Sequence, residues 1–250
     1  MIELKSKEQL GRMRKAGRIV AETLELMREM VAPGVTTEQL DRVAEDYIGK
    51  CNAIPAFKGY NGFPATLCTS INEEVVHGIP GLRALKSGDI ISIDCGAIID
   101  GYVGDSAITL PVGKISRELQ NLLAVTEESL RCGIAQALKG NRLFDISCAI
   151  QTYVEENTMS VVRDYVGHGI GRKMHEEPQV PNFGKPGRGP RLEVGMVLAI
   201  EPMVNLGGYQ VETLENQWTV VTKDRRASAH FEHTVAITEN GPEILTRIEG

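Results

Sequence analysis

The chain has 250 residues, a hydrophobic content of 42% and a formal net charge of −6 at pH 7. This length and apolar content suffice for one large domain or two small ones. Acidic and basic residues are mixed along the chain, which excludes the basic footprint that nucleic-acid-binding proteins carry.

The cysteines and the N-terminus indicate a compartment. Five cysteines, none of them in a Cys-x-x-Cys pair, argue against a disulfide scaffold and against a thiolate zinc site. Reduced thiols in a cytosolic protein are the simplest account. The opening Met-Ile-Glu-Leu-Lys-Ser-Lys lacks the apolar core of a signal peptide. No apolar run approaches the roughly 20 residues of a membrane helix. We therefore expect a cytoplasmic protein without membrane contact.

Two helices open the predicted order of elements. Ser6 with Gln9, and Thr36 with Gln39, have the spacing of capping boxes. Helices are therefore expected from Ser6 to about residue 30 and from Thr36 to about residue 50. A loop rich in glycine, proline and aromatic residues follows over 53–64, and a short strand is expected near 67–71.

A β-hairpin is predicted next, with arms near 90–98 and 102–110. Asp100-Gly101 between the arms is a strong type I′ turn signal. With these two residues as the loop, Asp94 pairs with residue 107 and Asp105 pairs with residue 96. The two carboxylates then project from one face as diagonal neighbours, with Cα atoms roughly 7–8 Å apart.

Like charges at that distance need protons, arginines or a metal ion if they are buried. Asp94 and Asp105 could instead lie on a solvated face, but both interrupt apolar strands, where aspartate has poor propensity. Gly96 and Gly104 beside them indicate a close backbone approach or a bulge.

The second half of the chain echoes the first. Ser116 can cap a long helix that ends near Lys139-Gly140, and 144–157 predicts another. Strands are expected near 160–166, 196–204, 209–213, 218–222 and 229–237, with a loop over 181–190. Two helices followed by hairpins, twice over, predict an α+β fold in a single domain whose pseudo-symmetric halves are about 1–112 and 113–250.

Three further residues have the chemistry of metal ligands. His168 lies between two glycines, which leave its imidazole accessible. Glu201 ends an apolar run before Pro202, which permits only an edge or terminal strand position. Glu232 is a charge within a strand. Together with the two aspartates they offer four carboxylates and one imidazole, whose charge balances two divalent cations. Such ligands suit Mn²⁺, Fe²⁺, Co²⁺ or Zn²⁺, and two ions roughly 3.5–4 Å apart can activate water for hydrolysis.

The other histidines are less specific. His77 precedes a Gly-x-Pro turn, and a lone histidine there is usually a satisfied polar residue. His175 opens His-Glu-Glu-Pro, but position 179 is Gln, so the helical zinc-protease motif is excluded. We expect His230 and His233, on either side of Glu232, to be structural or on the surface.

Five motifs occur in the order of a known family. They are Asn-Glu-Glu-Val-Val-His-Gly-Ile-Pro, Asp-Cys-Gly…Gly-Asp-Ser-Ala, Gly-His-Gly-Ile-Gly…His-Glu-Glu-Pro, Ile-Glu-Pro and Phe-Glu-His-Thr. With them the chain resembles the type I methionine aminopeptidases over essentially its whole length. It lacks the long insertion of the type II enzymes and a zinc-finger extension, so the short bacterial form is expected. The resemblance implies the pseudo-twofold pita-bread fold and hydrolytic removal of an initiator methionine that precedes a small residue.

The resemblance also implies roles for individual residues. His168 and Glu201 would bind one metal ion, Asp94 would chelate the other, and Asp105 and Glu232 would bridge them. His77 and His175 would contact the substrate amide and the developing tetrahedral intermediate, and Glu201 would share in catalysis. The methionine pocket would draw on Tyr60, Phe63, Cys68 and Trp218. Met174 stands where relatives often carry an aromatic residue.

The family implies a monomer that meets the N-terminal methionine of nascent polypeptides through transient ribosome contact. Two alternatives stay open. An Xaa-Pro peptidase of the same fold usually carries a large extra N-terminal domain, whereas this chain opens on the first helix of the fold. A non-catalytic, peptide-binding member would lack metal ligands, whereas all five are present here.

Overall fold

The computed structural model describes residues 2–248. Two helices precede a group of strands in the first part of the chain, up to residue 111. The elements there are α1 Lys7–Met30, α2 Thr37–Lys50, β1 Ile54–Pro55, a 3-10 turn at Tyr60–Gly62, β2 Leu67–Ile71, β3 Glu74–Val76, β4 Ile90–Ile99 and β5 Tyr102–Pro111.

The rest of the chain repeats this order with more and shorter strands. Its elements are α3 Arg117–Ala135, α4 Leu143–Glu156, β6 Ser160–Val161, β7 Gly167–Gly169, β8 Glu176–Val180, β9 Val197–Ile200, β10 Met203–Asn205, β11 Val211–Thr213, β12 Val220–Thr222, β13 Ser228–His230, β14 Glu232–Thr238 and β15 Gly241–Ile244. None of the helices within residues 2–248 is long and apolar enough to cross a membrane.

Both predicted capping boxes are present. The backbone N–H of Gln9 donates to Ser6 Oγ, and the N–H of Ser6 donates to Gln9 Oε1 at 2.7 Å. Thr36 and Gln39 make the same reciprocal pair at the start of α2. Because each box satisfies donors that a helix start leaves free, the two N-terminal helices begin where the sequence predicts.

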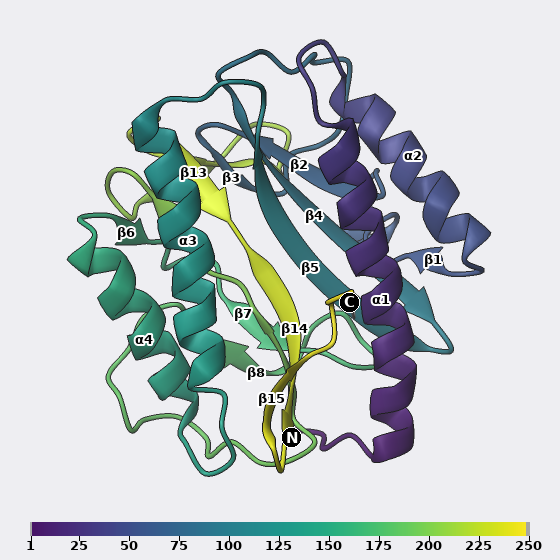
Figure 1. The fold of residues 1–250 in the computed structure, drawn as a ribbon, viewed down its shortest axis with the longest axis vertical. Coiled ribbons are helices and arrows are strands. Elements are labelled where there is room, and N and C mark those ends of the chain that lie inside the picture. Colours follow the sequence, from purple (N-terminus) through teal and green to yellow (C-terminus); the bar gives the residue numbers. More distant parts are fainter. Residues whose placement is uncertain (1, 249–250) are drawn as a thin grey trace.

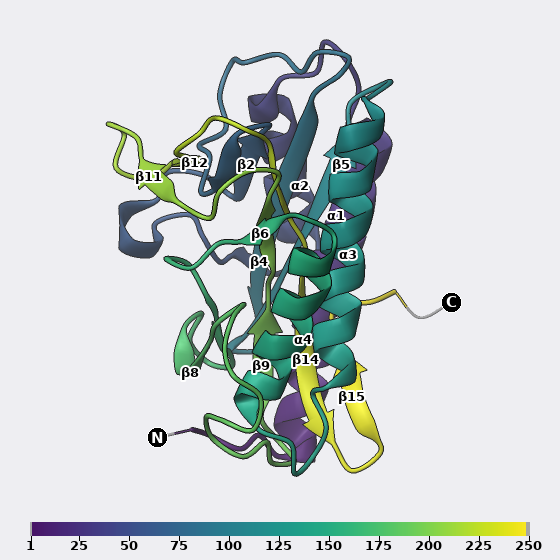
Figure 2. The ribbon, with the colours of Figure 1, turned by 90° about the vertical axis from the view of Figure 1, so that its left-hand side faces the viewer.

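The main sheet has nine antiparallel strands in the order β1-β4-β5-β14-β9-β7-β8, with β2 paired to β4 and β15 paired to β14 (Figure 1). Strand β14, from the C-terminal part of the chain, therefore joins the β4–β5 hairpin to β9. In Figure 2 the four helices lie on one side of this sheet, and β11 and β12 lie on the other. Two smaller sheets, β13-β10-β6 and β11-β12-β3, complete the fold.

The helices are held by two large apolar clusters. One lies under α3 and α4 and includes Leu122, Ile146 and Ile150 with residues of β9 and β14. The other lies under α1 and α2 and includes Val20 and Leu40 with residues of β2, β4 and β5. Each helix pair thus buries its apolar face on its own part of the same sheet.

The β4–β5 hairpin has the predicted register. Asp94 pairs with Ala107, and Gly96 pairs with Asp105, along a ladder without a shift. The turn residue Asp100 has φ +52° and the next residue has φ +74°, as a type I′ turn requires. The predicted turn and pairing are confirmed, and the hairpin contains no bulge.

The close approach expected at Gly104 is confirmed. A Cβ at this position would lie 2.7 Å from the backbone nitrogen of Gly17 on α1. Helix α1 therefore crosses β5 with backbone nearly against backbone, which only glycine permits. At Gly96 the neighbours are side chains instead, since a Cβ there would meet Phe57 and Met174.

Several predicted strands are wrong in extent. The strand expected over 196–204 is broken at Glu201-Pro202, and that over 229–237 is broken at Phe231. Proline lacks the N–H that a ladder needs, so β9 ends and β10 joins a different sheet. The strand at 160–166 shrinks to two residues, and α3 ends at residue 135 rather than near 139. Strands β1, β3, β7, β8 and β15 were not predicted, because they are short and lack alternating apolar residues.

Candidate metal centre

Three adjacent strands bring three carboxylates to one face of the sheet. Asp94 on β4 pairs with Ala107 on β5, and Ala107 pairs in turn with Glu232 on β14. Asp105 lies two residues before Ala107 and so points to the same face. Asp105 and Glu232 are 4% and 2% exposed. The three groups are neighbours because β14 pairs directly with the hairpin.

The backbone beside Asp105 is fixed by a threonine on β14. The N–H of Asp105 donates to Thr234 Oγ1 at 3.1 Å, and that hydroxyl donates to the carbonyl oxygen of Asp105 at 2.8 Å. On the same pair of strands, Ser106 Oγ donates to the carbonyl oxygen of Glu232. These bonds hold β5 and β14 together where the main ladder between them is only two residue pairs long.

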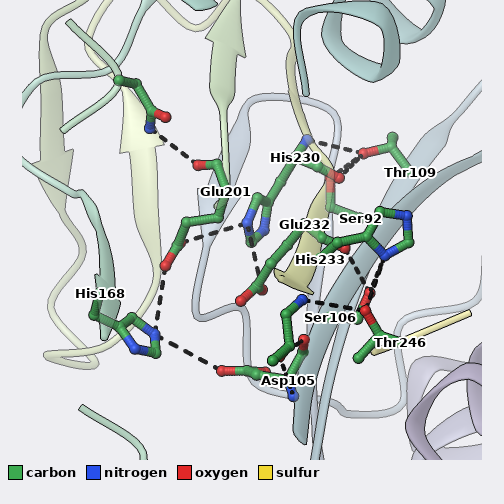
Figure 3. A network of polar contacts seen from close by, with 12 residues as sticks. Ser92, Asp105, Ser106, Thr109, His168, Glu201, His230, Glu232, His233 and Thr246 are labelled. Carbon is green, nitrogen blue, oxygen red and sulfur yellow. Dashed lines mark hydrogen bonds and ion pairs between the residues drawn. The ribbon is translucent and has the colours of Figure 1, made fainter. Parts of the chain in front are cut away.

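His168 on β7 completes the group from the other side. Its Nδ1 lies 3.0 Å from the carbonyl oxygen of Gly169 and donates to it. The opposite nitrogen, Nε2, then carries a lone pair and lies 3.5 Å from Glu201 Oε1 and 3.8 Å from Asp105 Oδ2 (Figure 3). An imidazole whose Nδ1–H binds a carbonyl has the tautomer of a metal ligand through Nε2.

The glycines on both sides of His168 have a different role from the one expected. A Cβ at Gly167 would lie 2.3 Å from the carbonyl oxygen of Ala199, and one at Gly169 would lie 2.2 Å from that of Glu177. They allow β8 and β9 to approach closely, and His168 is only 7% exposed. The glycines therefore do not expose this imidazole to bulk solvent, and it is accessible from the cavity that it lines.

Glu201 reaches the group because β9 ends immediately before it. Asn182 Nδ2 donates to the carbonyl oxygen of Glu201 at 3.0 Å, which satisfies backbone that the strand break would otherwise leave unpaired. The side chain of Glu201 is 13% exposed, and its two oxygens face two different imidazoles. The interruption at Pro202 therefore positions a functional carboxylate.

Burial controls the ionisation of these groups. It raises the pKa of Asp94, Glu201 and Glu232 well above the usual carboxyl range, with a further increase from the neighbouring carboxylates. Burial also raises the pKa of Asp105 to about 7. The pKa of His168 is lowered to about 4, first by burial and then by the proximity of His175. Burial therefore favours neutralisation of these carboxyl groups, either by protons or by a bound cation.

The donor atoms fit a metal ion. Three buried carboxylate oxygens have no hydrogen-bond partner within residues 2–248: Asp94 Oδ1, Asp105 Oδ1 and Glu232 Oε1. Asp105, His168 and Glu232 place ligand atoms within 4.8 Å of one another, and so do Glu201, His230 and Glu232. The two sets share Glu232, while Asp94 belongs to neither. Oxygen and imidazole donors with unsatisfied lone pairs are those that divalent cations bind.

His230 was not predicted as a site residue. This residue is 2% exposed, and its Nε2 lies 3.6 Å from Glu201 Oε2 and 4.0 Å from Glu232 Oε2. His230 is therefore not on the surface, and its ring faces the carboxylates. The spacing of two residues from Glu232 was the available signal, since such neighbours share a side of an extended chain. His233 is structural as expected, with Nδ1 2.9 Å from Thr246 Oγ1.

A cavity of about 170 Å³ contains all the predicted site residues. Its lining joins the five predicted ligands to the six residues assigned to substrate: Tyr60, Phe63, Cys68, His77, His175 and Trp218. Phe57, Asn61 and Met174 also line it and were not predicted as site residues. The rings of Phe63 and Trp218 meet edge to face at 5.1 Å. The lining of the cavity thus combines acidic and apolar side chains.

Two more histidines line the cavity. His77 has φ +60°, a strained conformation for this residue type, of the kind that collects at functional sites. Nδ1 of His175 lies 2.8 Å from the hydroxyl of Tyr60, and its ring lies 4.3 Å from that of His168. Burial lowers the pKa of both, to about 4 for His77. They are therefore neutral near pH 7.

A hydrolytic metal site on this fold defines the class of the protein as a metallopeptidase. Residues 11–239 match the model of metallopeptidase family M24, and the chain belongs to that family. Its relatives include methionine aminopeptidases. It is 60% identical to the methionine aminopeptidase of Clostridium perfringens over all of both chains, and 60% identical to methionine aminopeptidase 1 of Bacillus subtilis over 99% of this chain and 100% of the relative.

Solved structures of other proteins have the same fold. The methionine aminopeptidase of Thermotoga maritima superposes with a TM-score of 0.98 at 46% identity, covering 99% of this chain and 100% of the other. Prolidase from Pyrococcus furiosus matches with a TM-score of 0.77 at 23% identity, covering 99% of this chain and 66% of that one, and shows a shared fold alone. The predicted pita-bread fold is confirmed, and the chain is a hydrolase rather than a non-catalytic member.

Proposed function

We propose that this enzyme removes the N-terminal methionine of peptides and nascent proteins whose second residue is small. The observation that carries the proposal is the single cavity in which an acidic cluster adjoins an apolar pocket. The apolar walls suit the unbranched side chain of methionine, and thioethers make favourable contacts with aromatic rings such as those of Phe63 and Trp218. The 60% identity to methionine aminopeptidases along the whole chain favours this substrate over an Xaa-Pro peptide.

The ligand assignment is part of the proposal. Two divalent cations, drawn from Co²⁺, Mn²⁺, Fe²⁺ and Zn²⁺, would be held by Asp94 on one side, by His168 and Glu201 on the other, and by Asp105 and Glu232 between them. When bound, they supply Lewis-acid activation of water. The charge of four carboxylates balances that of two divalent cations, which supports a count of two metal ions. Metal analysis of protein purified without added metal, beside titration of activity with each ion, tests it.

The remaining polar groups would act on the substrate. Neutral His77 and His175 can each donate a hydrogen bond, and we assign them to the scissile amide and to the oxyanion that develops from it. The apolar pocket of Tyr60, Phe63, Cys68 and Trp218 would exclude water from the methionine side chain. Glu201 would serve catalysis through its place beside His168, 3.5 Å away.

Peptide hydrolysis tests the substrate. We expect Met-Gly and Met-Ala peptides to be cleaved and Met-Lys peptides scarcely at all, because a long charged side chain would lose its hydration without gaining a partner. An acetylated Met-Ala peptide should resist, since the free α-amino group is required. Equal rates on Met-Ala and Met-Lys would exclude a closed second-residue pocket. Preferred cleavage of Xaa-Pro peptides would instead support the alternative.

We further propose one domain with pseudo-symmetric halves at about 1–112 and 113–250. The repeat of a helix pair followed by strands supports it, as does the apolar cluster under each pair.

We also propose a monomer that works in the cytoplasm and contacts the ribosome transiently, because the N-terminal methionine of a new chain first emerges there. Sedimentation of the protein alone and with ribosomes tests both, and a stable dimer would contradict the first.

A further inference from the structure

His230 places an unused polar atom against the proposed metal ligands. Its Nε2 is buried and has no hydrogen-bond partner among residues 2–248. The atom lies 3.6 Å from Glu201 Oε2 and 4.0 Å from Glu232 Oε2. A buried nitrogen without a partner is costly unless something at the site requires it.

The residue is held in place from its backbone. The N–H of His230 donates to Thr109 Oγ1 at 2.9 Å, and that hydroxyl donates to the carbonyl oxygen of His230 at 2.8 Å. Ser92 Oγ lies 2.9 Å from the same hydroxyl. Figure 3 shows these bonds on one side of His230 and the ring directed toward Glu201 on the other. The ring is thus aimed at the carboxylates by a fixed main chain.

Glu201 lies between two imidazoles, one for each of its oxygens. Oε1 is 3.5 Å from His168 Nε2, and Oε2 is 3.6 Å from His230 Nε2. A carboxylate that holds a cation through one oxygen leaves the other in need of a donor when the site is buried. The 3.6 Å separation leaves no room for a water molecule and is longer than a hydrogen bond, so direct donation requires a small rotation of the Glu201 side chain.

We propose that His230 is a positioning residue of the metal centre, whose Nε2–H donates to Oε2 of Glu201 and leaves Oε1 directed toward His168. This inference rests on the metal centre proposed above. The two imidazoles that face Glu201 then have opposite tautomers. His168 donates through Nδ1 to a carbonyl and keeps a lone pair on Nε2, whereas His230 carries its proton on Nε2.

The tautomers can be measured on the unaltered protein. Protein with ¹⁵N-labelled histidine is loaded with ¹¹³Cd²⁺, and the nitrogen resonances are assigned with a His230→Gln sample. We expect coupling between cadmium and Nε2 of His168, no coupling at His230, and a proton on His230 Nε2. Coupling at His230 would make this imidazole a ligand, and a proton on its Nδ1 instead would leave Nε2 without a hydrogen to donate; either result would overturn the inference.

Metal affinity gives a second measurement. Calorimetric titration with Mn²⁺ is run on the parent protein, His230→Ala, His230→Gln and the control His233→Gln. His230→Ala should bind about 10–100-fold more weakly, as outer partners of metal ligands typically contribute that much. His230→Gln should stay within about threefold, because its amide N–H can donate to the same oxygen. His233 bonds to Thr246 away from the cluster, so its variant should keep the parental affinity.

The outcomes distinguish the donor role of His230 from the metal centre on which that role depends. Parental affinity in His230→Ala, or equal losses in the alanine and glutamine variants, would refute a donor role for His230. If the parent protein binds no Mn²⁺, the proposed metal centre is wrong, and so is the role of His230 that rests on it. If His230→Ala does not fold, the tautomer measurement on the parent still decides.

Discussion

The hydroxyl of Tyr60 lies 2.8 Å from Nδ1 of His175, and the centroids of the two rings lie 5.5 Å apart with the rings tilted by 33°. When the phenol donates to Nδ1, the proton of the neutral imidazole resides on Nε2. Tyr60 thereby makes His175 a donor through Nε2, in addition to forming a wall of the apolar pocket.

Tyr60→Phe should therefore affect turnover more than binding. The ring is retained, so KM should change little, while kcat should fall about fivefold, because one hydrogen bond of about 1 kcal/mol no longer holds the imidazole. Steady-state kinetics on a Met-Ala peptide measure both constants. A raised KM with an unchanged kcat would limit Tyr60 to the pocket wall.

The histidines should divide into two groups. His77→Ala and His175→Ala should each keep metal affinity near that of the parent but lose about 10²–10³ in kcat, the usual cost of one oxyanion donor. His168→Ala should lose metal affinity as well, since its Nε2 faces Glu201 and Asp105. Titration calorimetry beside kinetics on the three variants makes the comparison. Equal losses of metal affinity in all three would show that the division is wrong.

Asp105→Asn should separate folding from function. The substitution removes one of the like charges that raise the pKa of Glu201 and Glu232, so the metal-free variant should be at least as stable as the parent. We expect kcat to fall by several orders of magnitude and the increase of Tm on adding Mn²⁺ to shrink. Thermal unfolding with and without Mn²⁺ provides the measurement. Near-normal turnover at saturating metal would exclude Asp105 from the bridge.

Metal affinity should rise with pH. The pKa of Asp105 is about 7, and those of Asp94, Glu201 and Glu232 are raised well above their usual values, so a cation must displace protons at lower pH. A carboxyl group whose pKa is higher in the folded protein than in the unfolded chain contributes stability at pH values below its unfolded pKa. That stability is lost as the pH rises through its folded pKa. The metal-free protein should therefore weaken as pH rises above about 6.5, where histidine protonation no longer contributes.

Calorimetry in buffers of different ionisation enthalpy tests this prediction. Between pH 6 and 7.5 we expect proton release on Mn²⁺ binding, together with a larger Tm increase at the higher pH. The Asp105→Asn variant, which has one titrating group fewer, should release fewer protons. Binding without proton release would mean that the carboxyl groups are already ionised in the metal-free protein.

The features of the fold that depend on a local sequence pattern were predicted correctly. The Ser6–Gln9 cap, the Asp100-Gly101 turn and the pairing of Asp94 with Ala107 are each set by residues close together in the chain, and each is confirmed. Strands as short as β7 and β8 carry too few residues for a periodic signal. They exist because β7 pairs with β9 and β8 pairs with β7. The approach of His230 to Glu201 depends on two strand breaks together, which no local pattern specifies.

The crossing of α1 over β5 gives a prediction for stability. Gly104→Ala should destabilise the protein by about 1–3 kcal/mol, the usual cost of overpacking, because its Cβ would lie 2.7 Å from backbone atoms that cannot rotate away. Gly11→Ala is the control, because it makes the same substitution at a glycine within α1 itself. Nothing lies within 4 Å of its Cβ, so it should stabilise by about 0.5–1 kcal/mol through helix propensity. Urea unfolding of the two metal-free variants measures both. Equal free energies of unfolding would show that α1 can move away from β5 at little cost.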